Sequence, residues 1–450
     1  MRAVILAGGK GTRIGCLYSE MPKPMIPVCG KPILQHQVET LTKQGITDIT
    51  LIVGYKAEVI QRHFGNGAAF GARIDYIAED EPLGTGGALT LLPREDTLAL
   101  FGDLYCEVDF ERLIRFHREK QAYITLFVHP NSHPRDSDIV AVDGENRVTA
   151  WYSKNESRGE LRNLVSAGIY VFSGDALPAG KAVKRDLERD LILPALPEGK
   201  VYAYRSAEYV KDMGTPERLT AVERDIMGGV AAARSLCGKQ RAVFLDRDGT
   251  INERRGLINS PEQVELIPGA ARAIAALNNS PFLAICVTNQ PVVARGMVTL
   301  PRLDAIHARL DSLLGGEGAY LDDLFFCPHH PDGGYPEEAP EYKVECGCRK
   351  PKPGLLIEAA NRYNIDLSRS YMIGDSAADV AAGKAARCAT VGVRTGEGLA
   401  DGKYQAVPDF VCDNLTEAVE QIQQQDVNVS RVKTIGDGAI IEGETGGDKH

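Results

Sequence analysis

The chain has neither a long hydrophobic run nor an excess of positive charge. Its first apolar run, residues 3–7, ends in glycines and is too short for a signal peptide. No later run reaches the roughly 20 residues of a membrane-spanning helix. Asp and Glu number 61 against 51 Lys and Arg, so the net charge of -10 provides no basic field for nucleic acid or an anionic membrane. We therefore expect a cytoplasmic protein whose partners are small molecules, with no nucleic acid and no membrane.

A disulfide framework is not expected either. The 10 cysteines are scattered through 450 residues, whereas such frameworks belong to short secreted chains. Only Cys327, Cys346 and Cys348 cluster, and a histidine lies beside them. This grouping indicates a metal site.

Two rounds of alternating strand and helix patterns occupy the chain. A chain of 450 residues exceeds the roughly 100 to 200 residues of one domain. Short apolar runs predict strands, and amphipathic stretches predict helices between them. The predicted strands are 3–6, 49–53, 124–128 and 169–172, then 242–245, 283–287 and 371–373, with helices at 33–44 and 268–277. The predicted fold class is α/β with parallel sheets, arranged as two Rossmann-like three-layer αβα domains in tandem.

The domain boundaries follow from composition. Gly228-Gly229 and an alanine run precede the second round of strands and mark a junction. We predict a first domain at 1–230, a linker at 231–240 and a second domain at 241–425. Residues 426–450 are rich in Gly, Asp and Glu with little periodicity, which predicts a poorly ordered tail.

A glycine loop follows the first predicted strand. In Gly8-Gly9-Lys10-Gly11-Thr12-Arg13 the missing side chains would let backbone N–H groups approach a polyphosphate, and Arg13 would add charge-assisted hydrogen bonds. The spacing fits neither the ATPase P-loop nor the dinucleotide-binding GxGxxG pattern. By itself the motif is equally well explained as a glycine turn after a strand.

Further motifs in the first domain favour the nucleotide explanation. Lys23 stands between two prolines that would present it rigidly to the phosphates. Residues 82–88 form a second glycine loop, which can lie against a flat base. Asp103 ends an apolar run, and Asp212 stands before Met-Gly-Thr-Pro. Two carboxylates at strand ends could hold a hard divalent cation such as magnesium.

With these motifs in order, residues 1–228 resemble the sugar-1-phosphate nucleotidyltransferase family, which joins a nucleoside triphosphate to a sugar 1-phosphate and releases pyrophosphate. The resemblance implies that Arg13 and Lys23 are catalytic and that Asp103 and Asp212 bind Mg2+. The sugar phosphate would attack the α-phosphate in line, so that the protein positions the reactants and stabilises charge. Ser153-Lys154-Asn155 replaces the family's Glu-Lys-Pro, so only the lysine carries over there. The implied nucleotide and sugar contacts are Gly8, Gly9, Gly11, Thr12, Gly84, Thr85, Gly86, Lys154 and Gly168.

Acidic residues follow the first strand of the second domain. Asp246 and Asp248 lie at its carboxyl end, where open α/β sheets bind ligands. A carboxylate can attack an anionic phosphate ester only if a cation screens the repulsion, and a second carboxyl must protonate the departing oxygen. The chain also supplies Thr288, the pair Arg349-Lys350, and Asp375. Without these companions, Asp-x-Asp-Gly-Thr would be explained by an N-cap and turn.

These four motifs come in the order found in the haloacid dehalogenase-type phosphatases, which the second domain resembles. The resemblance implies that Asp246 is the nucleophile that forms an aspartyl phosphate and that Asp248 is the general acid and then the base. It implies a magnesium site made by Asp246, Asp375 and the backbone carbonyl of Asp248, with Asp379 ordering the surrounding shell. The span between Asp248 and Thr288 is too short for a large cap domain, so loops are expected to close the site. The implied substrate contacts are Thr288, Asn289, Arg295, Arg349 and Lys350.

One such loop carries the cysteine cluster. Cys327, His329, Cys346 and Cys348 would make a closed tetrahedral zinc site that pins a loop with few apolar residues to bury. This zinc would be structural. Reduced and merely buried cysteines are the alternative. His330 is a second candidate for the histidine ligand, because only the family register favours His329.

The zinc-bearing subgroup resembles the D-glycero-D-manno-heptose 1,7-bisphosphate phosphatases and the related histidinol-phosphate phosphatases. Ala294-Arg295-Gly296 favours the heptose enzymes, although Pro291-Val292 departs from their usual Ser-Gly. A heptose bisphosphate phosphatase yields the heptose 1-phosphate that a sugar-1-phosphate nucleotidyltransferase consumes. Residues 81–87 also resemble the heptose 1-phosphate guanylyltransferases. Together the halves resemble the last two steps to GDP-D-glycero-α-D-manno-heptose, a precursor of bacterial surface polysaccharide.

The expected enzyme therefore removes the 7-phosphate of the heptose bisphosphate and then transfers GMP from GTP to the heptose 1-phosphate, with Mg2+ in both domains. Two alternatives remain. One is a nucleotidyltransferase for mannose 1-phosphate or another sugar, joined to a histidinol-phosphatase-like or broad phosphatase. The other is a sensor or scaffold with an inactive N-terminal domain. The sequence does not indicate an oligomeric state.

Overall fold

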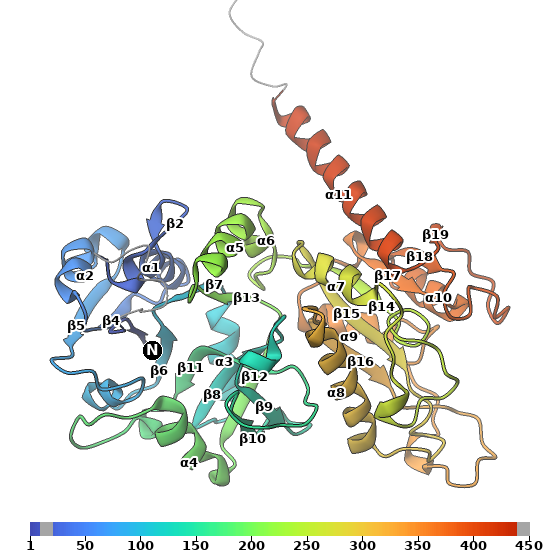
Figure 1. The fold of residues 1–450 in the computed structure, drawn as a ribbon, viewed down its shortest axis with the longest axis horizontal. Helices are drawn as coiled ribbons and strands as arrows, with labels where there is room; N and C mark the ends of the chain where they lie inside the picture. The colour runs from blue at the N-terminus through green and yellow to red at the C-terminus, as the bar shows by residue number, and fades with distance from the viewer. Residues whose placement is uncertain (10–20, 439–450) are drawn as a thin grey trace, which may run out of the picture.

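The computed structural model describes residues 1–9 and 21–438, with side chains described as far as residue 427. Two α/β units lie side by side, each with a central sheet covered by helices (Figure 1). The last helix, α11 (Leu415–Gly438), extends away from the second unit. The predicted α/β class with two such units in tandem is confirmed.

The N-terminal sheet is mixed. Its parallel strands, in spatial order, are β6 (Thr97–Phe101), β1 (Arg2–Leu6), β4 (Asp48–Val53) and β5 (Arg73–Ala78). β11 (Val165–Phe172) runs antiparallel to β6 and continues the sheet. The strands beyond it are β8 (Ile124–His129), β9 (Ile139–Val142), β10 (Val148–Tyr152) and β12 (Val201–Arg205). Ala3, Val4 and Ile5 are all buried, because both faces of the central strands are covered.

Helices cover one face of this sheet more regularly than the other. α1 (Ile33–Lys43), α2 (Ala57–Phe64) and α3 (Phe110–Glu119) pack Leu34, Ile60 and Leu113 into one apolar cluster. The opposite cluster includes Leu89 and Ile192 from less regular segments. The remaining elements are the ribbon β7 (Leu104–Glu107) with β13 (Tyr209–Asp212), the short strands β2 (Pro27–Val28) and β3 (Lys31–Pro32), and the helices α4 (Leu193–Ala195), α5 (Pro216–Met227) and α6 (Val230–Ala233).

The C-terminal sheet is parallel throughout. Its spatial order is β16 (Asp323–Cys327), β15 (Phe282–Asn289), β14 (Arg241–Leu245), β17 (Tyr371–Gly374), β18 (Ala389–Val393) and β19 (Phe410–Cys412). Its helices are α7 (Ala270–Asn278), α8 (Leu300–Gly316), α9 (Gly354–Arg362), α10 (Ala377–Ala385) and α11. The strand order reverses at β14, which is the first of these strands in the chain. Ligands of such sheets bind at the carboxyl ends of the strands at this reversal.

One sequence expectation differs from the structure. The strand expected at 169–172 belongs to β11, which runs antiparallel to its neighbours rather than parallel. An apolar run indicates that a strand is buried, but it does not indicate whether the strand runs parallel or antiparallel to its neighbours. Helix α11 continues to Gly438, because no glycine or proline interrupts residues 415–435, and the poorly ordered tail at 426–450 stays a prediction. Residues 439–450 lie outside the described residues.

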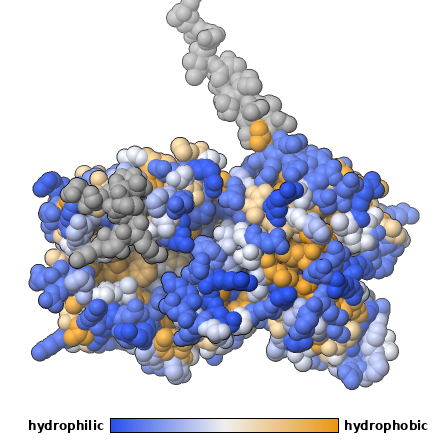
Figure 2. All heavy atoms as spheres, viewed as in Figure 1, coloured by the Kyte–Doolittle hydropathy of each residue, from blue (hydrophilic) through white to orange (hydrophobic). Residues whose placement is uncertain are grey.

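The junction between the two units is packed rather than open. The predicted linker, residues 231–240, begins within α6, and Ala231, Arg234 and Leu236 are buried. The exact boundaries remain a prediction. Figure 2 shows a mostly hydrophilic surface with scattered apolar patches. In the described part of the chain, no helix combines the length and the apolar character needed to cross a membrane.

Candidate active sites

Three carboxylates meet at the carboxyl ends of the C-terminal sheet. Asp246 follows β14, Asp375 follows β17, and Asp379 lies in the first turn of α10. All three are buried, and one oxygen of each lies within 4.8 Å of the others. Burial is the largest cause that raises the pKa of Asp246, and burial followed by the charge of Asp379 raises the pKa of Asp375 to about 7. A compact set of buried carboxylate oxygens suits a hard divalent cation such as Mg2+.

Lys350 neutralises part of this charge. Its Nζ lies 2.6 Å from Asp246 Oδ1 and 2.6 Å from Asp379 Oδ1, and it donates to the carbonyl of Val287 at 2.7 Å. Burial alone would lower the pKa of Lys350, but the facing carboxylates raise it above its usual range. One cation against three carboxylates leaves the pocket two charges negative when all are ionised. The residues therefore fit a divalent metal ion at this position.

Asp248 points to other partners. Arg247 Nη2 lies 2.7 Å from Asp248 Oδ2, and Gln290 Nε2 donates to the same oxygen at 3.0 Å. Burial alone would raise the pKa of Asp248, but the guanidinium of Arg247 holds it below its usual range. Gly249 follows Asp248 directly and packs against Asp375. Its φ is +95°, and a Cβ added there would lie 2.2 Å from Asp375 Oδ2, so the position requires glycine. Of the predicted magnesium ligands, the structure groups Asp246 and Asp375 with Asp379, and places the Asp248 side chain outside that group.

The residues predicted to contact the substrate in this domain have different partners in the structure. Thr288 is buried and accepts from Gln290 Nε2 at 2.9 Å. Asn289 holds the backbone of Lys350, because its amide donates to the Lys350 carbonyl and accepts from the Lys350 N–H, each at 3.0 Å. Arg295 stacks on the ring of Tyr335 with 4.5 Å to its centroid, and Arg349 donates to the carbonyl of His329 at 3.2 Å. Asn289 therefore orients Lys350 in this structure.

The four predicted zinc ligands come together at the end of β16, whose last residue is Cys327. The Sγ atoms of Cys327, Cys346 and Cys348 lie 3.2 to 3.5 Å apart, and His329 Nδ1 lies 3.4 Å from Cys348 Sγ. A tetrahedron with zinc–sulfur bonds of about 2.3 Å has edges of about 3.8 Å. His330 is not part of this group, since its Nδ1 accepts from the N–H of Asp332 at 3.1 Å. The donor set and its spacing suit a structural zinc ion.

The first glycine loop of the N-terminal domain is described only as far as Gly9. Gly8 and Gly9 follow β1, and Gly8 lies against Gly54, which follows β4. The predicted residues Gly11, Thr12 and Arg13 lie outside the described residues.

The two predicted metal-binding carboxylates of this domain lie at one end of the β7–β13 ribbon. Asp212 is opposite Leu104, and the N–H of Met213 donates to the carbonyl of Asp103 at 3.1 Å. Lys23 Nζ pairs with Asp103, and Arg218 Nη1 donates to Asp212 Oδ1 at 2.7 Å. Burial alone would raise the pKa of Asp212, but Arg218 lowers it. Lys23, Asp103 and Asp212 are thus assembled, with each carboxylate paired to a cation.

The second glycine loop is held by the segment before α4. The N–H of Gly86 donates to the carbonyl of Arg185 at 3.0 Å, and Thr85 Oγ1 accepts from the N–H of Leu187 at 2.8 Å. Gly84 has a φ of +75°, and a Cβ there would lie 2.4 Å from the Arg185 carbonyl oxygen. Close packing against this segment is therefore one reason for glycine at this position.

Glu79 connects the two glycine loops and was not identified from the sequence. A Cβ on Gly8 would lie 2.4 Å from Glu79 Oε2, and Glu79 Oε1 accepts from the N–H of Leu83 at 3.2 Å. Burial raises its pKa. It stands in the acidic run Glu79-Asp80-Glu81, which resembles an ordinary solvated loop. The signal that could have found it is its position directly after residues 73–78, which form β5 at the edge of the sheet but were not predicted as a strand.

A third group lies where β10 leads to β11 through residues 153–164, here called the sugar loop. The N–H of Lys154 donates to Asp138 Oδ1 at 2.8 Å. Burial, followed by the charges of Asp138 and Asp186, raises the pKa of Glu188 to about 7, and Lys154 opposes this shift. Gly168 has a φ of +76° and packs on the Phe101 ring. Asp138 and Glu188 were also missed from the sequence, because nothing in their spacing relates them to Lys154.

The two halves of the chain match different families of known proteins. Residues 2–228 match the nucleotidyl transferase family model, and residues 347–418 match the HAD-hydrolase-like model. The chain is 38% identical over 256 residues to a mannose-1-phosphate guanylyltransferase of Mycobacterium tuberculosis, covering 55% of this chain and 70% of that protein. It is 40% identical over 184 residues to a D-glycero-beta-D-manno-heptose-1,7-bisphosphate 7-phosphatase of Yersinia pestis, covering 40% of this chain and 95% of that protein.

Similar solved structures also cover one half each. HddC from Yersinia pseudotuberculosis complexed with GMP-PN is 28% identical, with a TM-score of 0.43, and covers 50% of this chain and 99% of that one. The D,D-heptose 1.7-bisphosphate phosphatase from B. bronchiseptica complexed with magnesium and phosphate is 35% identical, with a TM-score of 0.36, and covers 41% of this chain and 99% of that one. The predicted combination of a nucleotidyltransferase and a haloacid dehalogenase-type phosphatase is confirmed by the sequence matches.

Proposed function

Since the chain belongs to the nucleotidyl transferase family over residues 2–228 and to the D-glycero-D-manno-heptose-1,7-bisphosphate 7-phosphatases over most of its second half, we propose that it makes a guanosine-diphosphate heptose in two consecutive reactions. The observation that carries this proposal is the presence of both families in one chain. The product of the phosphatase family is a sugar 1-phosphate, which is the acceptor that the transferase family requires. We place both reactions in the cytoplasm, where GTP is available.

In the first reaction, Asp246 attacks the phosphorus of the 7-phosphate while the bond from phosphorus to the sugar oxygen breaks. Asp248 gives its proton to the departing oxygen and then takes a proton from the water that hydrolyses the aspartyl phosphate. Lys350 and Thr288 stabilise the transferring phosphoryl group. A Mg2+ ion held by Asp246 and Asp375, with Asp379 beside them, would screen the negative charge that otherwise repels the attacking carboxylate.

Lys350 has a second task in this reaction. Its Nζ contacts the nucleophile at 2.6 Å, so it orients Asp246 before the substrate enters, and its charge opposes the rise in the pKa of Asp246 that burial causes. Arg247 holds Asp248 ionised in the absence of substrate, with 2.7 Å between Nη2 and Oδ2. Asp248 therefore has to leave Arg247 or take up a proton when the phosphate ester binds. Zinc at the Cys327 cluster would fix the loop that ends at Arg349 and Lys350.

In the second reaction, a phosphate oxygen of the heptose 1-phosphate attacks the α-phosphorus of GTP and pyrophosphate leaves. Lys23 stabilises the charge that develops on the phosphates, and Lys154 holds the sugar phosphate. Asp103 and Asp212 are the residues that would hold Mg2+ here once Lys23 and Arg218 turn from them toward the triphosphate. Arg13, Gly11 and Thr12 complete the triphosphate contacts in this proposal.

Glu79 supports guanine as the base. Guanine presents an N1–H and a 2-amino group side by side, and a carboxylate can accept from both at once. Adenine lacks this pair of donors, and uracil and thymine have one ring N–H between two carbonyl oxygens. Glu79 lies between the Gly8 loop and the Gly84 loop, where the base would be enclosed.

A mannose 1-phosphate acceptor is the second candidate. The match at 38% identity to a mannose-1-phosphate guanylyltransferase favours it. The heptose is preferred because only a heptose 1-phosphate is the product of the phosphatase family to which the second half belongs.

The test follows both reactions together. Purified protein is incubated with D-glycero-D-manno-heptose 1,7-bisphosphate, Mg2+ and each nucleoside triphosphate in turn, and phosphate, pyrophosphate and nucleotide sugar are measured by mass spectrometry. We expect GDP-heptose only with GTP. Asp246→Asn should stop both products, whereas Asp103→Asn should stop only the nucleotide sugar. Phosphate without nucleotide sugar from wild-type protein would return the transferase half to the mannose or sensor alternatives, and no phosphate would refute the heptose assignment.

A further inference from the structure

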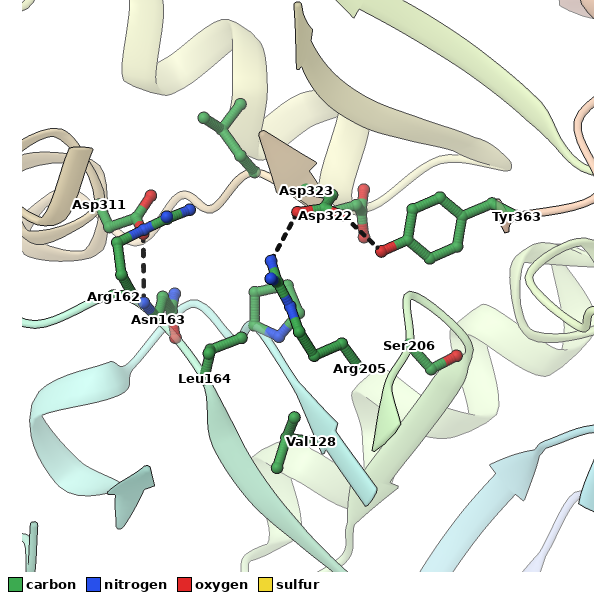
Figure 3. Close-up of a pocket in the computed structure, with 12 residues that line it drawn as sticks. Val128, Arg162, Asn163, Leu164, Arg205, Ser206, Asp311, Asp322, Asp323 and Tyr363 are labelled. Carbon is green, nitrogen blue, oxygen red and sulfur yellow. Dashed lines mark hydrogen bonds and ion pairs between the residues drawn. The ribbon is translucent and has the colours of Figure 1, made fainter. Parts of the chain in front are cut away.

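The sugar loop of the transferase domain ends against helix α8 of the phosphatase domain. Arg162 Nε donates to Asp311 Oδ2 at 2.8 Å, and Arg162 Nη1 donates to Asp304 Oδ1 at 3.0 Å. The N–H of Asn163 donates to the same Asp311 oxygen at 3.2 Å. Figure 3 shows Arg162 and Asn163 turned toward Asp311 across the boundary between the two units. Asp304 and Asp311 are seven residues apart, which places them two turns apart on one face of α8.

This contact is largely removed from water. The Asp311 side chain is 7% exposed and the Arg162 side chain 21%. A buried carboxylate that loses its partner keeps an uncompensated charge, so these two side chains constrain each other strongly. Beside them, Arg309 of α8 donates to Glu160 of the sugar loop at 2.5 Å. Further along α8, a Cβ on Gly315 would lie 2.6 Å from Pro134, so α8 also lies close to the segment before β9.

The other end of the sugar loop carries Lys154, which the proposed function assigns to the sugar phosphate. Lys154 is tied to Asp138 through its backbone, and Ser166, just past the loop, donates from its N–H to the Asp138 carbonyl at 3.3 Å. The loop therefore has one anchor at Asp138 and one on α8. Its geometry depends on both, because a loop fixed at one end only keeps more of its conformational freedom.

Helix α8 also lies close to the phosphatase catalytic loop. Its His307 is completely buried; burial, followed by the charges of Arg247 and Arg162, lowers the pKa of His307. Both arginines are therefore close enough to affect one imidazole. Arg247 holds Asp248 of the phosphatase, whereas Arg162 holds the sugar loop of the transferase.

We propose that α8 is the support on which the sugar loop is positioned, and that Arg162 is a positioning residue through which the phosphatase domain sets the affinity of the transferase domain for its sugar 1-phosphate. This inference rests on the proposed function, which assigns Lys154 to the sugar phosphate. The transferase half would then bind GTP normally but bind its acceptor weakly whenever the contact with α8 is lost.

The interface provides a matched control. Arg205 of β12 donates to Asp323 Oδ1 at 2.8 Å across the same boundary, and the Asp323 side chain is 1% exposed. Figure 3 shows this pair beside the Arg162 contact. Arg205 does not belong to the sugar loop. Arg162→Met and Arg205→Met therefore each remove a buried arginine–aspartate pair between the domains, but only the first removes a side-chain contact of the loop.

The experiment measures full-length wild type, Arg162→Met and Arg205→Met with heptose 1-phosphate and GTP. For Arg162→Met we expect KM for the sugar phosphate to rise between about 5- and 150-fold, with KM for GTP and the phosphatase kcat/KM unchanged. Arg205→Met should leave all three values near wild type. Hydrogen exchange, which needs no turnover, should show faster exchange of the amides in 153–164 only in Arg162→Met.

Two results would overturn the inference. One is an equal rise of KM in both variants, which would mean that the interface as a whole matters and not the loop contact. The other is an unchanged KM and unchanged amide exchange in Arg162→Met. Should Arg162→Met fail to fold, Asp304→Asn removes the more exposed partner and should raise KM for the sugar phosphate by about 1.5- to 5-fold. Failure of wild-type protein to use any sugar 1-phosphate would refute the proposed function instead, and the exchange measurement would still test the loop contact.

Discussion

Replacing Glu208 by glutamine should make the protein more stable above neutral pH and leave its stability at acid pH unchanged. Glu208 is 3% exposed and lies where the first domain meets the linker. Its Oε1 accepts from the backbone N–H groups of Asp109 at 2.7 Å and Leu236 at 3.1 Å, and its Oε2 accepts from Ser206 Oγ at 2.9 Å. All three donors are neutral. Burial is the largest cause that raises the pKa of Glu208 to about 7.

The sign and size of the effect follow from this shift. Between the usual glutamate pKa near 4.5 and about 7, the folded protein keeps a proton that the unfolded chain has lost. The contribution that this bound proton makes to the free energy of unfolding is fully present below pH about 4.5 and is lost as the pH rises through about 7. A shift of about 2.5 pKa units at about 1.4 kcal/mol each gives about 3 kcal/mol. Glutamine can accept the same two backbone N–H groups without ever carrying the charge.

The assay is urea unfolding of wild type and Glu208→Gln at pH about 4 and pH about 8, below and above the two pKa values. The variant should nearly equal wild type at the lower pH and exceed it by about 3 kcal/mol at the higher pH. Other buried acids titrate in both proteins, so the difference between the two curves isolates Glu208. Glu111→Gln, at a side chain that is 86% exposed on α3, should leave the wild-type curve unchanged. A difference of the same size at both pH values would refute the argument that the folded protein holds this proton.

Three further predictions concern the sites. Lys350→Met should lower the phosphatase kcat by about 10²- to 10³-fold, while GDP-heptose formation from supplied heptose 1-phosphate stays at the wild-type rate; equal loss of both activities would contradict the assignment of Lys350 to one site. Glu79→Gln should lower kcat/KM for GTP by about 10- to 100-fold relative to the other nucleoside triphosphates, as measured by competition between nucleotides. An unchanged preference for GTP would show that Glu79 does not recognise the base. Cys346→Ser should lower bound zinc, measured by elemental analysis, from about one per chain toward zero and reduce phosphatase activity more than transferase activity; a full complement of zinc in this variant would exclude Cys346 as a ligand.

The local elements of both domains could be predicted because their residues carry the information themselves. The runs at 3–6 and 242–245 are apolar throughout and become the buried central strands β1 and β14. The direction of β11 could not be predicted, since it depends on which neighbour the strand meets. The group of three cysteines and His329 could be predicted because Cys346-Gly347-Cys348 brings two thiols together by spacing alone.

Residues whose role depends on distant partners were missed or given another role. Glu79 and Glu188 are ordinary acids in the sequence, and their significance arises only where β5 and the segment before α4 end beside other loops. Asp379 completes the carboxylate group because α10 begins immediately behind β17. Asn289 was assigned to the substrate, yet in the structure its amide holds the backbone of Lys350. Spacing along the chain does not distinguish these roles.

The ion pairs between the domains suit two enzymes that are already joined. Arg162–Asp311, Arg205–Asp323 and Arg234–Asp322 are all largely buried, and the cost of removing such charges from water offsets much of their attraction. An interface of this kind contributes little affinity, but its charges can all pair in only one relative orientation of the two domains. Two separate proteins would need affinity to stay together, whereas a covalent linker supplies a high effective concentration without it. The fusion therefore leaves the interface free to define orientation, and the orientation that it defines brings the sugar loop onto α8.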